Sequence, residues 1–240
     1  MSKKHKAYLN WSSGKDAMLA LHQLQSSAEL SVEKLVTTVN TDFNRVSMHG
    51  LAISLLEKQA ERLQLPLYQI PLSGNVSMKV YNETMQKHVS YLKKEGFSHS
   101  VFGDIFLEDL KTYREEQLSK VELQAIFPLW KKDSRSLVKE FIDMGYKAVV
   151  VCTNANYLGE SFCGRIIDHQ FLADLPLTVD PCGENGEFHS FVFDGPLFTS
   201  PIDFELGDKV LRDYSPSNED DCHQEPLSWD HQFWYVELLG

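Results

Sequence analysis

One stretch decides the fold: Lys6-Ala7-Tyr8-Leu9-Asn10-Trp11-Ser12-Ser13-Gly14-Lys15-Asp16-Ala17. A run with strand character ends at two serines and a glycine, and a helical pattern begins directly after them. The N-terminus of such a helix binds anions, because its first-turn amides have no acceptor within the helix and the helix dipole favours negative charge. The stretch therefore predicts a nucleotide phosphate loop, in which Lys15 adds a cation and Asp16 can hold Mg²⁺.

The same residues also have a purely structural interpretation. Ser13-Gly14-Lys15-Asp16 fits the capping-box pattern of a hydroxyl residue followed by an acid at the start of a helix. The loop is not a Walker loop, because Asn10 stands where that motif needs glycine and Asp16 where it needs serine or threonine. A phosphate loop at this position would therefore belong to another nucleotide-binding class.

Strand-like and helix-like segments alternate through the first half of the chain. Strand character recurs at residues 34–39, 67–71, 100–104 and 124–129. This order predicts parallel βαβ units with right-handed crossovers, whose ligands bind at the carboxyl ends of the strands. We therefore expect an α/β fold in which three loops meet at one crevice, at residues 12–16, 40–50 and 103–108.

The second half has a different pattern, and we place a domain boundary near residue 130. A helix at residues 133–144 begins at the capping acid Asp133, and a strand at 148–152 and further strand-like segments follow. We expect a nucleotide-binding domain at residues 1–130, with a parallel sheet of about five strands and helices on both faces. Residues 131–240 should form a smaller α+β domain that carries the substrate and catalytic groups.

A second stretch, Glu184-Asn185-Gly186-Glu187, combines a turn signal with negative charge. Asn-Gly between apolar runs is the strongest short signal for a β-hairpin, since both residues tolerate positive φ. In a strand after this turn, Glu187 and His189 point to the same face. An acid beside an imidazole can position a nucleophile, accept a proton or bind ammonium. The alternative is a plain turn beside a packed histidine, because Phe191 and Phe193 share that face.

Two further motifs also have two interpretations each. Asp104 follows a strand, so it either caps the next helix or faces substrate or a metal-bound phosphate at the carboxyl edge. Arg114 lies in a charged helix, and such charges are typical of a solvated surface. His49 either marks the start of an exposed helix or contributes to the second of the three loops.

The composition argues against several classes of protein. The 240 residues carry a formal net charge of −11, which disfavours broad binding to nucleic acid or anionic membranes. No signal peptide or membrane-spanning run is evident, and the four cysteines form no Cys-x-x-Cys pair. We therefore expect a cytoplasmic protein with reduced thiols and without a membrane or nucleic acid partner.

The sequence resembles the diphthine–ammonia ligase family, of the N-type ATP pyrophosphatase class, in motifs that occur in the same order. Residues 12–17 correspond to its Ser-Gly-Gly-x-Asp-Ser pyrophosphate loop and residues 48–50 to a Met-His segment. Gly103-Asp104-Ile105 with Arg114 and Glu116 matches the central motif, and residues 128–130 match a Pro-Leu-Trp segment. Residues 183–189 and 194–196 match the Gly-Glu-x-Gly-Glu signature and its Asp-Gly-Pro sequel.

This resemblance implies a Rossmann-like (HUP-type) PP-loop domain and a ligase reaction. ATP with Mg²⁺ would adenylate a substrate carboxylate, and ammonia would then attack it and release AMP. The catalytic residues implied are Glu184, Glu187, His189 and Asp104. The nucleotide-binding residues implied are Ser12, Ser13, Gly14, Lys15, Asp16, His49 and Gly103, with Asp16 as the metal ligand.

Departures from the family pattern leave the acceptor open. Ser13 and Ala17 replace a glycine and a serine of the loop, Asn185 replaces a glycine, and His189 stands where the ligases tend to carry an acid. The acceptor is therefore a protein or a small metabolite, for example a cobalamin-related one. A different class of alternative is a sensor that binds ATP without turnover. Ammonium is the expected nitrogen source, and a homodimer is compatible with the sequence.

Overall fold

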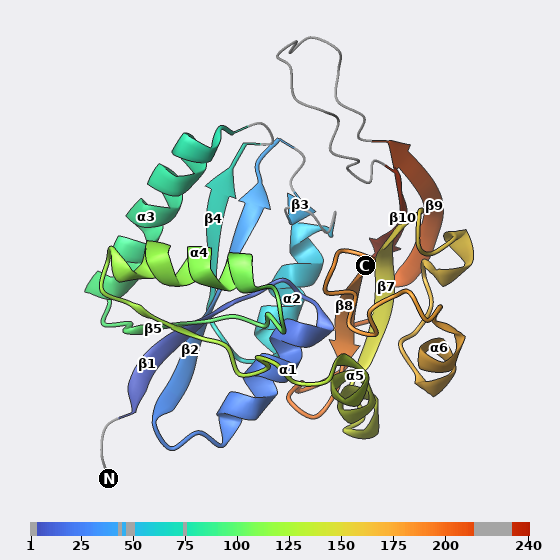
Figure 1. Cartoon of the computed structure of the whole chain (residues 1–240), viewed down its shortest axis with the longest axis horizontal. Helices are drawn as coiled ribbons and strands as arrows, with labels where there is room; N and C mark the ends of the chain where they lie inside the picture. The colour runs from blue at the N-terminus through green and yellow to red at the C-terminus, as the bar shows by residue number, and fades with distance from the viewer. Residues whose placement is uncertain (1–3, 43–44, 47–50, 74–75, 214–231) are drawn as a thin grey trace.

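The computed structural model describes residues 4–42, 45–46, 51–73, 76–213 and 232–240. The first half forms a six-stranded sheet, in which five strands are parallel and lie in the order β4-β2-β1-β5-β6 (Figure 1). The short β3 (Arg45–Val46) pairs antiparallel with the end of β2. This confirms the predicted parallel sheet of about five strands. Its parallel strands are β1 (His5–Asn10), β2 (Leu30–Asn40), β4 (Leu67–Leu72), β5 (His99–Val101) and β6 (Gln124–Ile126).

Helices cover both faces of this sheet, as predicted. One face carries α1 (Lys15–Gln25) and α2 (Ile53–Arg62), and the other carries α3 (Met78–Lys94) and α4 (Glu108–Ser119). Neighbouring residues of a strand point to opposite faces. Leu9 of β1 accordingly lies in the buried cluster with α1 and α2, and Tyr8 lies in the cluster with α3 and α4. Hydrophobic burial therefore holds the sheet from both sides.

The strand order reverses between β1 and β5. After β1 the chain crosses to β2 and β4 on one side, and it then returns to β5 and β6 on the other. In open α/β sheets the ligand crevice lies at such a reversal, outside the carboxyl ends of the strands. The loops that follow β1 and β5 are therefore the first place to look for a site.

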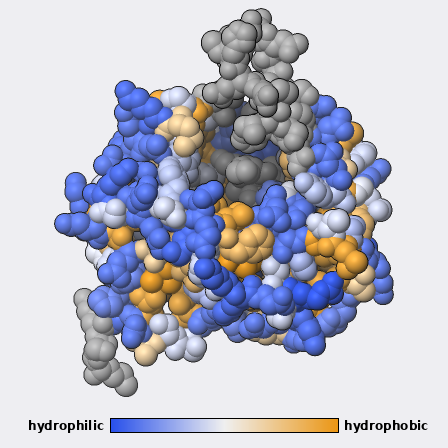
Figure 2. All heavy atoms as spheres, viewed as in Figure 1, coloured by the Kyte–Doolittle hydropathy of each residue, from blue (hydrophilic) through white to orange (hydrophobic). Residues whose placement is uncertain are grey.

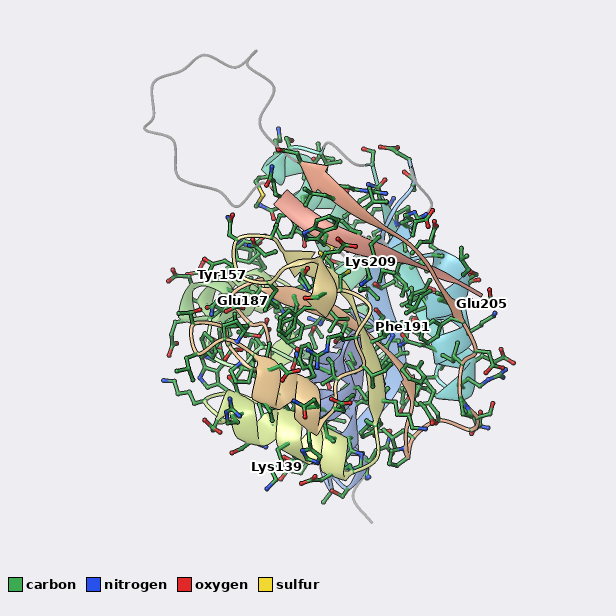
Figure 3. The ribbon with its side chains drawn as sticks, turned by 90° about the vertical axis from the view of Figure 1, so that its right-hand side faces the viewer. Lys139, Tyr157, Glu187, Phe191, Glu205 and Lys209 are labelled. Atoms are coloured by element: carbon green, nitrogen blue, oxygen red, sulfur yellow. The ribbon has the colours of Figure 1, made fainter. Side chains whose placement is uncertain are left out.

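The second half forms a four-stranded antiparallel sheet in the order β8-β7-β10-β9. Figure 3 looks onto this half, with Phe191 on β8 and Glu205 and Lys209 on β9. Asp133 caps α5 as predicted, since its Oδ1 accepts from the Ser136 amide at 2.8 Å. The elements are α5 (Ser134–Asp143), β7 (Lys147–Asn154), the 3₁₀ turn η1 (Glu160–Phe162), α6 (His169–Asp174), β8 (Phe188–Asp194), β9 (Glu205–Asp213) and β10 (Gln232–Leu239).

The two halves share one hydrophobic core. The buried cluster that contains Leu9 and α1 also contains Val149, Phe191 and Val236 of the second sheet. Helix α1 contacts both α5 and β8. The second half is therefore packed directly against the helix that follows the phosphate loop, and this contact decides how the site is built.

The surface agrees with the composition. The face seen in Figure 2 is mostly hydrophilic, and its apolar residues lie in separate patches. Among the described residues, no helix is both long enough and apolar enough to cross a membrane. The expected cytoplasmic location, the lack of a nucleic acid partner and the homodimer stay predictions.

Candidate active site

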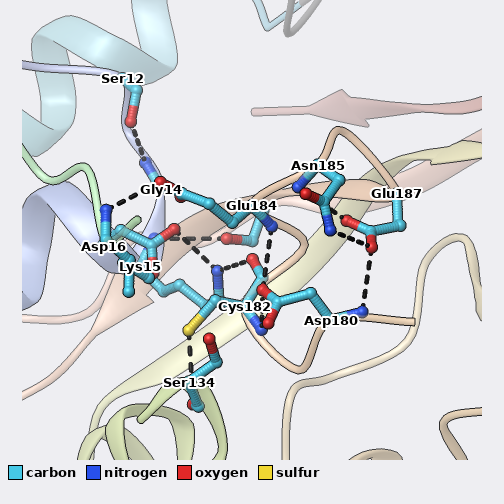
Figure 4. Close-up of polar contacts among 12 residues, drawn as sticks. Ser12, Gly14, Lys15, Asp16, Ser134, Asp180, Cys182, Glu184, Asn185 and Glu187 are labelled. Atoms are coloured by element: carbon cyan, nitrogen blue, oxygen red, sulfur yellow. Dashed lines mark hydrogen bonds and ion pairs between the residues drawn. The ribbon is translucent and has the colours of Figure 1, made fainter. Parts of the chain in front are cut away.

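The phosphate loop joins β1 to α1 at the carboxyl edge of the first sheet (Figure 4). Gly14 precedes the first helical residue, Lys15. Ser13 has a φ of 70°, in the left-handed region that favours glycine. A side chain in that region costs about 1 kcal/mol, so contacts from the rest of the molecule must hold the loop in this conformation.

Strand β8 supplies part of those contacts. The Val192 amide donates to the Ser13 carbonyl at 3.0 Å, and the Lys15 amide donates to Ser190 Oγ at 3.2 Å. A Cβ on Gly14 would lie 3.2 Å from the Ser190 carbonyl oxygen, so glycine is what permits this close approach. The phosphate loop therefore lies between its own sheet and a strand of the other half.

Gln59 of α2 braces the same loop and is fully buried. Its Nε2 donates to the carbonyls of Ser13 at 3.0 Å and Val192 at 2.6 Å, and its Oε1 accepts from Trp11 Nε1 at 2.9 Å. The sequence interpretation missed both Gln59 and Ser190. A polar residue on the apolar stripe of a helix was the one signal for Gln59, and no local signal marks Ser190.

Lys15 lies inside the protein, with only 2% of its surface exposed. Its Nζ donates to Asp16 Oδ2 at 2.8 Å and to the Cys182 carbonyl, and it lies 5.2 Å from the centre of the Phe188 ring (Figure 4). Burial alone lowers the pKa of a lysine, but the carboxylates of Asp16 and Glu184 outweigh it and raise the pKa of Lys15. The predicted cation is present, and it is fixed between the loop and residue 182.

Glu184 brings a carboxylate from the second half to the first. Its Oε1 accepts from the Ile105 amide, in the loop after β5, at 2.7 Å. Burial is the main reason why the pKa of Glu184 is raised to about 7. The nearby charges of Asp16 and Asp104 add to this rise, and the Ile105 hydrogen bond and the charge of Lys15 oppose it. A carboxylic acid with such a pKa can exchange a proton near neutral pH.

Asp104 forms an ion pair with Arg114. Arg114 Nη1 donates to Asp104 Oδ2 at 2.6 Å, and the guanidinium lies 4.3 Å from the centre of the Phe102 ring. Burial, opposed by the Arg114 charge, raises the pKa of Asp104. The same burial lowers the pKa of Arg114, although Asp104 counteracts it. Asp104 is thus positioned at the site, and Arg114 is not a solvated surface charge.

Gly103 brings the loop after β5 onto the phosphate loop. A Cβ at this position would lie 2.8 Å from the backbone carbon of Asp16 and 2.9 Å from the Ala17 amide nitrogen. Any side chain would push the two loops apart. In this structure Gly103 is therefore needed for close backbone contact at the reversal point, whatever it contributes to ligand binding.

A cleft of about 1680 Å³ runs across these groups and draws its walls from both halves. It is lined by the phosphate loop, Gly103, Asp104, Glu184 and His189, and by Asn40 at the end of β2 and Asp42 directly after it. His49 lies outside the described residues. The cleft thus collects most of the candidate residues that the structure describes.

Glu187 differs from the expectation that it would face the cleft beside His189. It is buried, its Oε1 accepts from the Asp180 amide at 2.9 Å and from Asn185 Nδ2 at 3.0 Å, and its Oε2 accepts from the Asn185 amide at 3.0 Å. The physical reason is that β8 begins only at Phe188, so strand alternation does not extend back to Glu187. Glu187 holds the turn that presents Glu184.

The donor set fits a magnesium ion shared with bound phosphates. Two buried oxygens, Ser13 Oγ and Asp16 Oδ1, have no hydrogen-bond partner among the described residues. Mg²⁺ prefers oxygen ligands and typically takes one or two carboxylates together with substrate phosphates. The described residues contain no group of three His, Cys, Asp or Glu side chains that could hold a metal ion by themselves. Asp16 Oδ1 is therefore the best-placed protein ligand for such an ion.

Family models match most of this chain. The diphthamide synthase N-terminal domain matches residues 5–124, and the diphthamide synthase C-terminal domain matches residues 133–214. The chain belongs to the diphthamide synthase family. The first match contains the phosphate loop and the second contains Glu184, so the cleft lies between the parts that the two models describe.

Curated relatives named diphthine–ammonia ligase have low sequence identity to this chain. The Danio rerio protein is 27% identical over 169 residues, which cover 63% of this chain and 66% of the relative. The Homo sapiens protein is 25% identical over 171 residues, which cover 65% and 64%. These matches span slightly less than two thirds of the relatives' length. A solved structure, the U34-tRNA thiolase NcsA from Methanococcus maripaludis, has a TM-score of 0.38 at 13% identity over 60% of this chain and 59% of that one. That likeness is too weak to inform function.

Proposed function

We propose that this chain is an ATP-dependent ligase that adenylates a substrate carboxylate and amidates it with ammonia. The observation that carries the proposal is the position of Glu184, a proton-exchanging acid on the same cleft as the phosphate loop. The reaction is the one that the relatives' name, diphthine–ammonia ligase, describes. Residues 1–130 would bind ATP and residues 131–240 the acceptor, a division supported by the gap between the two family matches.

The triphosphate would lie over the loop at residues 12–16. In the structure the amides of Gly14 and Lys15 donate to Ser12 Oγ and Ser190 Oγ. Phosphate oxygens would replace these hydroxyl acceptors, and the charge of Lys15 would favour them electrostatically. Two of the three N–H donors of Lys15 Nζ bond Asp16 and the Cys182 carbonyl, so direct contact with a phosphate would use the third donor or displace one of these bonds. Mg²⁺ held by Asp16 would neutralise charge on the departing pyrophosphate.

The reaction proceeds in two steps. A carboxylate oxygen attacks the α-phosphorus, the bond to the β-phosphate oxygen breaks, and pyrophosphate leaves. Ammonia then attacks the carbonyl carbon of the acyl-adenylate, and AMP leaves. Adenylation is needed because a carboxylate alone is a poor electrophile. Glu184 would take a proton from ammonium, with His189 and Asp104 on the same cleft, and Glu187 would act by positioning Glu184.

A small-metabolite acceptor is the second candidate, and it is kept because one departure from the family pattern lies on the cleft. Asn185 serves the turn, because its amide and side chain both bond Glu187. His189 instead lines the cleft. His189 is therefore the departure that bears on which acceptor is bound.

Product analysis tests the proposal. ATP, ammonium and a panel of protein and small-molecule carboxylates should yield AMP and pyrophosphate together with an amide. Formation of ADP and phosphate would overturn the adenylation mechanism. Binding of ATP without any turnover across the panel would support the sensor instead.

A further inference from the structure

Arg114 presents a guanidinium that is fixed from two sides and still has donors to offer. Asp104 accepts one of its hydrogen bonds, and the Phe102 ring supports its plane. A guanidinium carries several N–H donors in a rigid fork, and it stays charged in proteins. Among the described residues no second acceptor bonds Arg114, and its side chain, 26% exposed, lines the cleft. Its remaining donors are therefore available to a ligand.

The position of Arg114 along the cleft narrows the choice of ligand. Gly103 contacts the first turn of α1, directly after the phosphate loop, and the next residue, Asp104, bonds Arg114. The Asp104 side chain therefore places the Arg114 guanidinium near the phosphate loop. On its other side the cleft continues between α3 and α4. Most lining residues there are neutral, among them Tyr81, Asn82, Met85, Leu110 and Gln117, and the charged Lys120 lies at the C-terminal end of α4. Arg114 thus lies between an anion site and a region suited to a neutral group.

We propose that Arg114 binds the α-phosphate of the nucleotide, and this inference rests on the proposed function. In the proposed pose the β- and γ-phosphates lie on the phosphate loop and the base lies between α3 and α4. The α-phosphate, which connects the terminal phosphates to the nucleoside, then lies beside Arg114. The fork of a guanidinium matches two non-bridging oxygens of a phosphate. These bonds hold the phosphorus in place for attack, and no proton is transferred, because the guanidinium only donates hydrogen bonds. Asp104 is then a positioning residue for Arg114.

The test compares AMP with adenosine by calorimetry. Wild-type protein should bind AMP more tightly than adenosine. In Arg114→Gln the affinity for AMP should fall roughly 10- to 100-fold, as expected for the loss of charge-assisted hydrogen bonds, while the affinity for adenosine stays unchanged. Arg114→Lys keeps the charge without the fork and should fall in between. Lys111→Gln is the matched control, because Lys111 lies on the same helix and pairs with Glu115 at 2.5 Å.

Each outcome decides a separate point. Retention of the wild-type ratio of AMP to adenosine affinity in Arg114→Gln overturns the inference and leaves the proposed function intact. Equal loss of both affinities also overturns it, because it marks a structural role for the ion pair. Unchanged adenosine affinity shows that the variant is folded. A wild-type protein that binds none of ATP, AMP and adenosine removes the proposed function, and the inference falls with it.

Discussion

The phosphate loop and the turn at residues 180–187 lie on the same cleft but are held in opposite ways. The loop depends on distant residues, since Gln59 of α2 and Val192 of β8 both bond Ser13. The turn is held largely by its own residues, because Asp180 Oδ2 accepts from the amides of Cys182 and Glu184, and Glu187 accepts from Asp180 and Asn185. The other half adds the bonds of Ile105 and Lys15 to this turn. The nucleotide side of the site should therefore respond to remote substitutions, and the acceptor side to local ones.

Glu184→Gln should give the largest effect on activity. It should impair amide formation, which we assign to the turn, and spare ATP binding, which we assign to the phosphate loop. The amide keeps the size of the side chain but cannot accept a proton, so amide formation should fall about 10²- to 10⁴-fold. ATP affinity should stay close to that of the wild type, because the phosphate loop does not depend on this side chain. Product assays and calorimetry on the same preparation check both parts, and a matching loss of ATP affinity would place Glu184 on the nucleotide side.

Glu187→Ala should be the largest stability effect in the turn. It removes a buried acceptor that bonds three donors, two of them on the exposed Asn185, which should lower the free energy of unfolding by about 2 kcal/mol. Urea denaturation measures the change, with Glu205→Ala on the exposed strand β9 as the matched control. A loss of activity at unchanged stability would instead mean that Glu187 takes part in the chemistry.

Gln59→Leu should weaken the loop from a distance. The substitution leaves Trp11 Nε1 without its acceptor and removes one donor from each of the Ser13 and Val192 carbonyls, at a cost of about 2 kcal/mol in stability. ATP affinity should also fall, since Ser13 loses one of its supports. Gln23→Leu, whose amide bonds Lys132 at the surface, is the control and should change neither quantity. Wild-type ATP affinity in Gln59→Leu would show that β8 alone holds the loop.

The pH dependence of stability should report on Glu184. Its pKa is raised in the folded protein from 4.5 to about 7, so between these values the folded state binds more protons than the unfolded state. Stability should therefore decline as pH rises through this window, by on the order of 1 kcal/mol after allowing for solvent screening of a partly exposed group. The free energy of unfolding, plotted against pH, should have a different slope in wild type and Glu184→Gln only within this window. Parallel plots for the two proteins would mean that the pKa of Glu184 is not raised.

Ser13→Gly should have the smallest effect. Glycine adopts a φ of 70° without strain, but it also gains freedom in the unfolded chain. The two contributions oppose each other, so the free energy of unfolding should change by less than about 1 kcal/mol. A large loss of stability would show that Ser13 Oγ has a partner that the loop needs.

Local patterns were enough to predict the sheet and both loops of the cleft. Neighbouring residues alone mark the change from strand to helix at Gly14 and the turn at Asn185-Gly186, and the chain changes direction at both. The β-hairpin that Asn-Gly predicts does not form, because among the described residues no strand directly precedes this turn and only Gly186 of the pair has a positive φ. The contacts of Ser190 and Gln59 depend on how distant segments pack, which no local pattern records. The same holds for the burial of Lys15. Glu187 was misplaced because the alternation of a strand was extended one residue beyond its start.

The most direct test of carboxylate adenylation follows an oxygen atom. An acceptor identified by product analysis is labelled with ¹⁸O in its carboxylate and converted with ATP and ammonium. Attack on the α-phosphorus predicts that one ¹⁸O atom appears in the phosphate of AMP, with none in pyrophosphate. Label in inorganic phosphate, or unlabelled AMP beside an amide product, would contradict the account.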